Sequence, residues 1–141
     1  MQRMGALDSY LYYSDVPDAM THTVKFGVLD PSTQPGTCNL EWLRDLVNRL
    51  LPTLGPMHQL VCPTPFGINH PLLVEPGSVD LEHHVRRIGI APPGSMAEMC
   101  EAISHLVEHQ LPRDKPLWQM WMLEGMKDGR IGILLILHHA I

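Results

Sequence analysis

The chain has 141 residues, of which 45% are hydrophobic and 18% are charged, so it can bury the core of one domain and is neither disordered nor membrane-like in composition. Its formal net charge is −5 and its only adjacent basic pair is Arg86-Arg87, which argues against nucleic acid as a partner. The longest apolar stretch, residues 131–137, is far shorter than the about 20 residues of a membrane helix, and no signal-peptide pattern opens the chain. We therefore expect a cytoplasmic protein.

The first elements are a short helix and a strand. Residues 4–14 favour a helix with Leu7 and Leu11 on one face. Apolar and polar side chains alternate over residues 22–29, which predicts a half-buried strand. Residues 31–36 are typical of a loop.

A second helix is predicted over residues 40–51, where leucines and a valine form one apolar stripe. Asn39 is placed to cap its start, and Pro52 ends it. The many prolines that follow leave room only for short extended segments, at residues 57–62 and 70–74.

A strand and a third helix come next. The strand is predicted over residues 84–90, before the breaker Pro92-Pro93-Gly94, and Ser95 predicts the N-cap of the helix. Helical spacing places one set of mostly apolar residues on a single face: Met96, Met99, Cys100, Ile103, Leu106, Val107 and Gln110. The opposite face is polar, so we expect it to be solvated.

The last third of the chain predicts a buried β-hairpin. Its arms are the apolar segments 117–123 and 131–137, and Asp128-Gly129 is a strong tight-turn dipeptide. Continuous hydrophobicity in both arms is typical of central strands. The predicted fold class is α/β, with a mixed sheet flanked by at least two helices in one unit over residues 1–141.

Nine histidines raise the question of a metal site. His105, Glu108 and His109 match the His-x-x-Glu-His pattern of inverted zinc proteases, but the helical period puts His105 and Glu108 on the solvated face. His83 and His84 open a predicted strand and would point to opposite faces, which favours surface or capping roles. The three cysteines form no Cys-x-x-Cys pair and fit reduced thiols, so no metal is expected.

His138 and His139 stand at the end of the most hydrophobic predicted strand. A histidine there is held by the sheet yet reaches its edge, and its ordinary pKa near neutrality suits a general base. Position alone favours a structural role for the pair.

Four segments carry a family resemblance: Pro116-Leu117-Trp118, residues 121–125, Gly129-Arg130 and residues 137–140. In order and spacing they resemble the wax ester synthase/diacylglycerol acyltransferase family of the chloramphenicol acetyltransferase-like superfamily. Weaker similarity at residues 4–8, 19–22 and 79–94 extends it over nearly the whole chain.

The resemblance implies the N-terminal lobe of a two-lobe fold, with a channel between the lobes for acyl-CoA and an acceptor. It implies that His139 is the general base that takes a proton from diacylglycerol or a long-chain alcohol, and that His138 packs beside it. It also implies that Pro116, Leu117 and Trp118 shape the acyl channel, although a core role for these residues is equally open. Acyl-CoA would be the co-substrate, and no bound cofactor is implied.

In the family's His-His-x-x-x-Asp-Gly pattern an Asp-Gly pair follows the histidines, whereas this sequence has only Ala140 and Ile141 after His139. We therefore expect the chain alone to be inactive and to need a C-terminal lobe, from the same gene product or from a separate chain. The alternative is a noncatalytic truncated or split lobe. A carrier-dependent relative, such as a polyketide-associated acyltransferase or a peptide condensation domain, is a third possibility. Lipid substrates would also imply peripheral association with a membrane or lipid droplet.

Overall fold

The computed structural model describes residues 1–33 and 36–141. Its helices are α1 (Ala6–Ser14), α2 (Leu40–Leu50), α3 (Leu81–His84) and α4 (Met96–Val107). Its strands are β1 (Gln2–Arg3), β2 (His22–Leu29), β3 (Leu60–Cys62), β4 (Leu72–Val74), β5 (Val85–Gly89), β6 (Trp118–Glu124) and β7 (Ile131–His138). Short 3₁₀ turns connect several of these elements.

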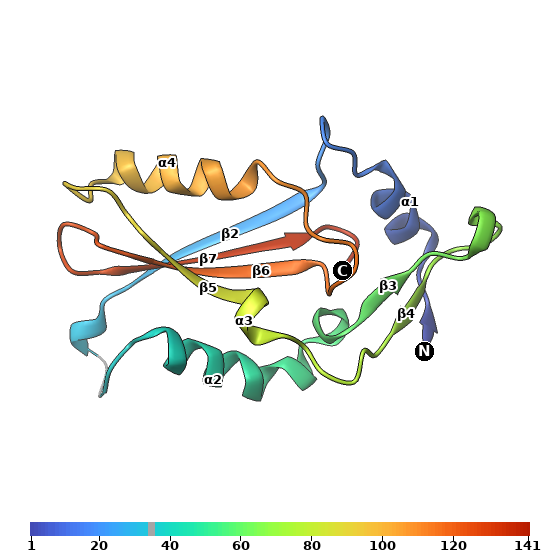
Figure 1. Cartoon of the computed structure of the whole chain (residues 1–141), viewed down its shortest axis with the longest axis horizontal. Coiled ribbons are helices and arrows are strands. Elements are labelled where there is room, and N and C mark those ends of the chain that lie inside the picture. Colours follow the sequence, from blue (N-terminus) through green and yellow to red (C-terminus); the bar gives the residue numbers. More distant parts are fainter. Residues whose placement is uncertain (34–35) are drawn as a thin grey trace.

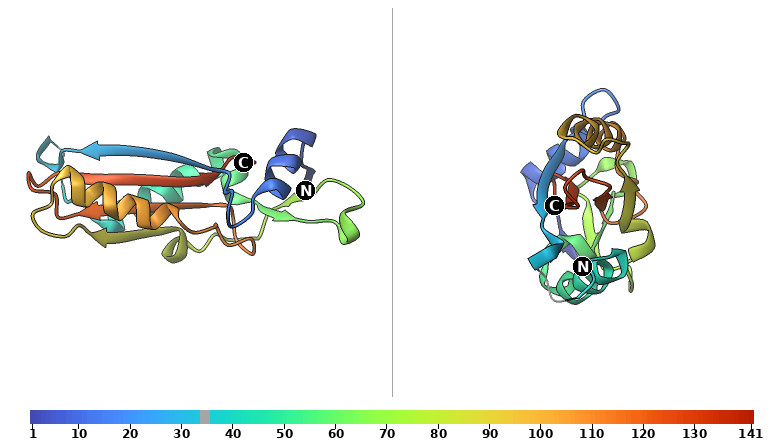
Figure 2. Two further views of the ribbon diagram at one scale, coloured as in Figure 1. Left: turned by 90° about the horizontal axis from the view of Figure 1, so that it is seen from above. Right: turned by 90° about the vertical axis from the view of Figure 1, so that its left-hand side faces the viewer.

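The main sheet has four strands in the order β2-β7-β6-β5. β6 and β7 form the predicted antiparallel hairpin, β2 is antiparallel to β7, and β5 is parallel to β6. The helices α4 and α2 lie on opposite sides of this sheet (Figures 1 and 2). The prediction of a mixed sheet flanked by helices, with the hairpin strands in the centre, is confirmed.

Side chains of β6 and β7 alternate between two cores. Leu123, Leu134 and Ile136 pack on the α4 side, whereas Trp118 and Met122 pack with α2. The alternation follows from the pleat of a strand, in which successive side chains point to opposite faces. Both central strands therefore bury side chains on two faces.

A second, three-stranded sheet has the order β1-β4-β3. The short extended segments predicted at residues 57–62 and 70–74 supply β3 and β4. The N-terminal strand β1 pairs with β4, and the amide of Met4 donates to the carbonyl of Pro71 at 2.9 Å. This sheet and α1 lie beyond the end of the main sheet where β7 stops (Figure 1).

The predicted helix caps are confirmed. The side chain of Asn39 accepts a hydrogen bond from the amide of Trp42 at 2.9 Å. Ser95 and Glu98 form a capping box at the start of α4. The Ser95 side chain accepts a backbone amide of the first turn, and the Glu98 side chain accepts the backbone amide of Ser95. These local contacts fix where α2 and α4 begin.

Burial differs from the sequence prediction on three elements. On α1, Leu7 is exposed, whereas Leu11 is partly buried and packs against the core with the buried Tyr12. On α4, Met96 and Cys100 are exposed. On β2 the apolar row of Val24, Phe26 and Val28 is 43, 38 and 38% exposed, since β2 is an edge strand of the main sheet.

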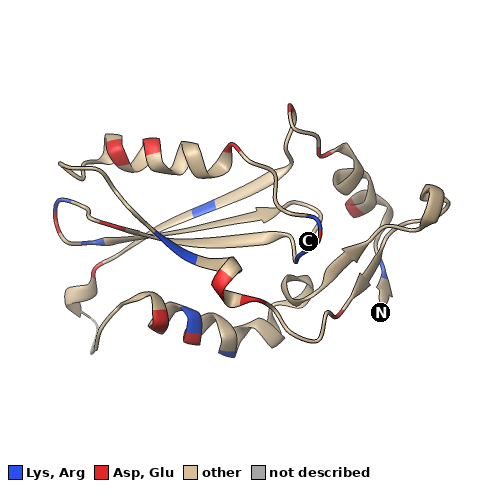
Figure 3. Cartoon of the chain, in the orientation of Figure 1, with Lys and Arg blue, Asp and Glu red and all other residues tan. Residues whose placement is uncertain are grey.

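Charged residues are scattered over the described part of the chain, without a continuous basic stripe along any helix or strand (Figure 3). No helix within residues 1–33 and 36–141 has both the length and the apolar character needed to cross a bilayer.

Candidate functional site

His138 ends β7 as a buried side chain, and its hydrogen bonds determine which nitrogen carries the proton. Its Nδ1 accepts the amide of Ala140 at 3.1 Å, so the hydrogen lies on Nε2. Nε2 is 3.2 Å from Oγ1 of Thr21, which itself donates to the carbonyl of Leu11 and can accept from the ring. His138 is therefore a neutral imidazole that ties β7 to the segment after α1.

Asp15 lies behind this histidine and is also buried. Its Oδ1 accepts the amide of Thr21 at 2.8 Å and its Oδ2 accepts Nε2 of Gln110 at 3.0 Å. Arg113 donates to the carbonyl of Asp15 at 2.8 Å and stacks on the ring of Tyr12, with its guanidinium carbon 4.4 Å from the ring centroid. The carboxylate thus joins the end of α1, the start of β2 and the segment after α4.

The pKa values agree with these charge states. Burial lowers the pKa of His138, against the opposing effect of Asp15. Burial acts to raise the pKa of Asp15, but hydrogen bonds from the Thr21 amide, Arg113 and Gln110 together hold it below its ordinary value. His22 pairs with His138 across the strands, and burial lowers its pKa as well. An ionised carboxylate therefore faces a neutral ring.

His139 differs from His138 because its side chain is exposed. Its amide donates to the carbonyl of Thr21 at 2.9 Å, which holds the backbone, and its Nδ1 lies 3.3 Å from Oγ1 of Thr23. The ring forms part of a pocket of about 350 Å³ that Asp8, His58 and other residues line. Of the two histidines, His139 is the one that can meet a ligand.

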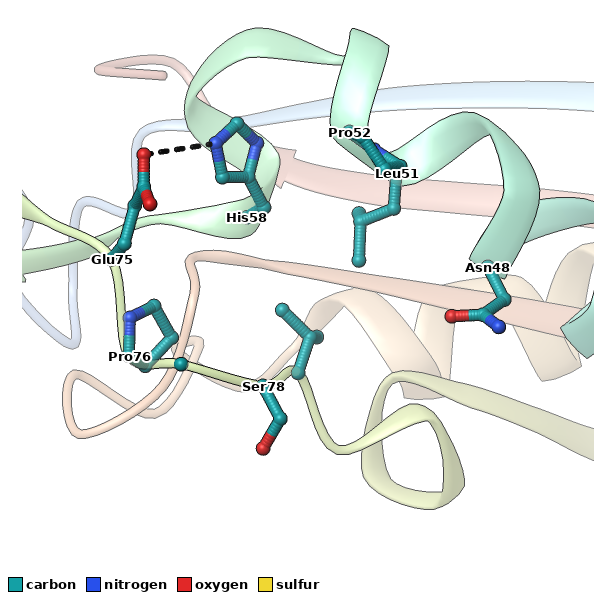
Figure 4. Close-up of a pocket in the computed structure, with 9 residues that line it drawn as sticks. Asn48, Leu51, Pro52, His58, Glu75, Pro76 and Ser78 are labelled. Carbon is teal, nitrogen blue, oxygen red and sulfur yellow. Dashed lines mark ion pairs between the residues drawn. The ribbon is translucent and has the colours of Figure 1, made fainter.

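A neighbouring pocket of about 400 Å³ shares His58 with the pocket of His139. Nε2 of His58 lies 3.8 Å from Oε1 of Glu75. Figure 4 shows this pair at one end of the pocket, with the side chain of Leu51 between it and Asn48 at the other end. The two pockets meet at His58. Together they extend from His139 along the 3₁₀ turn at residues 55–58.

The sequence-predicted channel residues Pro116, Leu117 and Trp118 are buried in the cores. The indole Nε1 of Trp118 donates to the carbonyl of Met57 at 2.6 Å. Leu117 receives the amide of His138 on its carbonyl at 2.9 Å, so this segment supports the end of β7. Their role in an acyl channel stays a prediction.

The surface or capping role expected for His84 is wrong. The side chain is buried, its Nδ1 lies 2.7 Å from the carbonyl oxygen of Trp118, and its ring stacks on the Trp118 ring at 4.5 Å between centroids. The physical reason is the single helical turn α3, which Asp80 caps and which turns His84 inward before β5 begins. His83 therefore lies beside it, with ring centroids 5.1 Å apart, and not on the opposite face of a strand.

Sequence reasoning missed Asp15, Thr21, Thr23 and Arg113. They come from segments far apart in the chain and belong to no local motif. Among the described residues there is no group of three or more His, Cys, Asp or Glu side chains arranged to hold a metal ion.

Comparisons with known proteins identify the family and the fold of the chain. The sequence model of the wax ester synthase/diacylglycerol acyltransferase catalytic domain matches residues 4–141. Two Mycobacterium tuberculosis (strain H37Rv) proteins named as candidate diacylglycerol O-acyltransferases are 39% identical over 140 residues and 30% identical over 141 residues. The matches cover 99 and 100% of this chain but only 30% of each relative, so the chain spans about a third of their length.

Solved structures share the fold. The wax ester synthase/diacylglycerol acyltransferase from Marinobacter aquaeolei VT8 superimposes with a TM-score of 0.81 at 23% identity, over 99% of this chain and 33% of that one. The starter condensation domain of rhizomide synthetase gives 0.71 at 10% identity, over 99% of this chain and 34% of that one. The fold is thus the chloramphenicol acetyltransferase-like fold that the sequence predicted. With the family's sequence model matching almost from end to end, this chain belongs to the wax ester synthase/diacylglycerol acyltransferase family.

Proposed function

We propose that this chain is the lobe that carries the general base of an acyl-CoA-dependent O-acyltransferase, which transfers a long acyl chain to diacylglycerol or a long-chain alcohol. Family membership and the names of the relatives support the reaction class. The assignment of His139 as the base rests on a difference between the two histidines. His139 is exposed in a pocket, whereas both ring nitrogens of His138 are engaged inside the fold.

The proposed step needs one proton acceptor. His139 takes the proton of the acceptor hydroxyl while that oxygen attacks the carbonyl carbon of the acyl-CoA thioester. The carbon–sulfur bond then breaks, and the thiolate of CoA receives the proton from His139. An alcohol is not ionised at neutral pH, so a base in hydrogen-bond reach contributes typically about 10²–10⁴-fold. The products are the ester and free CoA, with no covalent acyl-enzyme.

Thr23 gives the ring its useful tautomer in this proposal. When Nδ1 of His139 carries hydrogen and Oγ1 of Thr23 accepts it, Nε2 keeps its lone pair for the substrate. The same arrangement stabilises the ring after it has taken up the second proton. Thr23 is thus a positioning residue for the base.

The remaining two thirds of the relatives' length would supply the second lobe and the Asp-Gly pair that follows the histidines in the family pattern. In this proposal Pro116, Leu117 and Trp118 support the wall of the channel from the core side. A lipid acceptor would be reached at a membrane or droplet surface by peripheral contact. A noncatalytic lobe is the competing hypothesis. An acyl-transfer assay decides between the catalytic and the noncatalytic lobe.

The test is an acyl-transfer assay with the chain alone and with the chain fused to the remaining part of the 39% identical Mycobacterium tuberculosis relative. We expect ester formation from the fusion with acyl-CoA and diacylglycerol or a long-chain alcohol, and a loss of at least about 100-fold in kcat for His139→Ala. His138→Gln is the matched variant and should act through folding stability. A correctly folded fusion whose His139→Ala variant is as active as the parent would refute the assignment of the base.

A further inference from the structure

A separate cavity of about 250 Å³ lies between α4 and the main sheet. α4 contributes His105 to its wall, β5 contributes Arg86, and β6 contributes Trp121. It shares no lining residue with the pocket of His139 or with the neighbouring pocket at His58. The proposed acyl-transfer step leaves it without a role.

Three residues that line this cavity each carry a buried polar atom with no hydrogen-bond partner among the described residues. These atoms are Nε2 of His83, Nε of Arg86 and Nε1 of Trp121. Nε of Arg86 and Nε1 of Trp121 always carry hydrogen, so both are donors that need an acceptor. A buried donor without an acceptor costs about 1–3 kcal/mol, and two such donors in residues that line one cavity favour a ligand that accepts hydrogen bonds.

The positive charge of Arg86 favours a ligand with a negative charge. No carboxylate within the described residues pairs with Arg86, and its guanidinium carbon lies 4.0 Å over the ring of Trp121. Its neighbour Arg87 is exposed and lies 3.8 Å from Glu124. Burial lowers the pKa of Arg86, but an arginine stays charged at neutral pH. A half-buried cation without a counter-ion is stabilised by an anion.

The remaining wall also favours an anion over a metal cation. His83, His105 and His109 line the cavity, but they do not form a metal-binding group, and the charge of Arg86 would repel a cation. Asp80 is the carboxylate that acts most strongly to raise the pKa of His83. Its own partner is Lys115, at 3.7 Å. Each of the three histidines carries a ring N–H in its neutral form and can donate it to an anion.

We propose that this cavity binds an oxyanion, a phosphate or carboxylate group, through the guanidinium of Arg86 and the indole N–H of Trp121, with histidines at its rim. A volume of about 250 Å³ admits such a group with a small attached moiety. The group has two sources, a free anion or the phosphates of acyl-CoA. Only the second source rests on the proposed function.

The cavity is connected to His138, the neighbour of the proposed base, by a short chain of contacts. Gln110 lines the cavity and donates to Oδ2 of Asp15 at 3.0 Å, and that oxygen lies 3.7 Å from Nε2 of His138. Gln110 therefore belongs both to the cavity wall and to the side-chain network that holds the end of β7.

Titration of the purified chain with inorganic phosphate, acetate and CoA tests the proposal. Tryptophan fluorescence and calorimetry provide the readouts, because Trp121 lies in the cavity. We expect saturable binding of at least one anion, weakened about tenfold or more in Arg86→Gln, since hydrogen bonds to charged groups are the stronger class. Arg87→Gln is the matched control on the adjacent residue and should bind within about twofold of the parent.

Arg86→Lys keeps the charge and the apolar stem but loses the Nε donor, so intermediate weakening is expected even where Arg86→Gln fails to fold. Tight binding of CoA that Arg86→Gln removes would identify acyl-CoA as the source, and binding of phosphate or acetate alone would identify a free anion. Absence of saturable binding of all three probes, or equal loss in Arg86→Gln and Arg87→Gln, would overturn the proposal. Anion binding and acyl transfer are measured separately, so a failure of one is distinguishable from a failure of the other.

Discussion

Oδ2 of Asp15 lies 3.7 Å from Nε2 of His138, and the two side chains are 2% and 1% exposed. The contact joins the residue after α1 to the last residue of β7, which precedes the exposed His139. Because the Thr21 amide and Gln110 also bind this carboxylate, the strand end is held by three segments of the chain. The first histidine of the pair thus fixes the backbone from which the second projects.

Thr23→Val tests the positioning of His139. The change removes the hydroxyl that lies 3.3 Å from Nδ1 of His139 and keeps the shape of the side chain. We expect kcat of the fused, active protein to fall about fivefold with KM unchanged, which corresponds to the loss of one hydrogen bond. Thr23→Ser keeps a hydroxyl and should restore most of the rate. Equal rates for the valine variant and the parent would contradict the role of Thr23.

Trp118→Phe tests whether the Pro116-Leu117-Trp118 segment supports the core. The indole of Trp118 is fully buried and donates to the carbonyl of Met57 at 2.6 Å. Phenylalanine fills most of the space but leaves that carbonyl without its donor, so we expect a loss of about 1–3 kcal/mol in the free energy of unfolding. Urea denaturation of the chain measures it. A variant as stable as the parent would show that the hydrogen bond is dispensable.

Elements defined by local sequence were predictable. The hairpin follows from two apolar segments around Asp128-Gly129, and the starts of α2 and α4 follow from Asn39 and Ser95, because each signal acts within a few residues of the chain. The exposed position of His139 at the end of β7 also agrees with its predicted place.

Features made by distant segments were not predictable. Arg113 reaches Asp15 across 98 positions of the chain, and no spacing rule connects them. The burial of His84 was not predictable, because a single turn of helix, capped by Asp80, takes the place of the first residue of the expected strand. β2 has the alternating pattern of a half-buried strand, but its burial depends on which elements cover it, and at the sheet edge its apolar row stays accessible.

Phe66→Ser tests peripheral contact with lipid. Phe66 and Ile68 are 98% and 81% exposed in the connection between β3 and β4, which projects from the end of the molecule in Figure 1. Insertion of a large apolar side chain into a bilayer surface removes it from water, so we expect the serine variant to bind phospholipid vesicles about tenfold more weakly in co-sedimentation. Phe66→Leu keeps an apolar side chain and is the control. Equal binding of Phe66→Ser and the parent would exclude this contact.

Gly94→Ala tests a close backbone approach. Gly94 has φ of 74°, and a Cβ there would overlap the carbonyl oxygen of Gly125 and lie 2.9 Å from the amide of Lys127. We expect a loss of at least about 2 kcal/mol in the free energy of unfolding, from the left-handed conformation and the forced backbone shift. Gly27→Ala is the matched control, because a Cβ at Gly27 meets nothing within 4 Å. Similar stabilities for both variants would show that the backbone adjusts.

The stability of the chain should fall as the pH drops below about 6.5, the ordinary pKa of histidine. Burial lowers the pKa of His84 and of His138 in the folded chain, so between the folded and unfolded pKa values the unfolded chain binds more protons. Their stabilising effect is therefore complete above about 6.5 and is lost as the pH falls toward the folded values. The lowered pKa of Asp15 acts in the same direction but only below about 3.9, the ordinary value of an aspartate. Urea unfolding at about pH 7.5 and pH 5 separates the two effects, and His84→Gln should show a weaker pH dependence than the parent. An unfolding free energy that rises from the higher to the lower pH would contradict the assignment of neutral, buried rings.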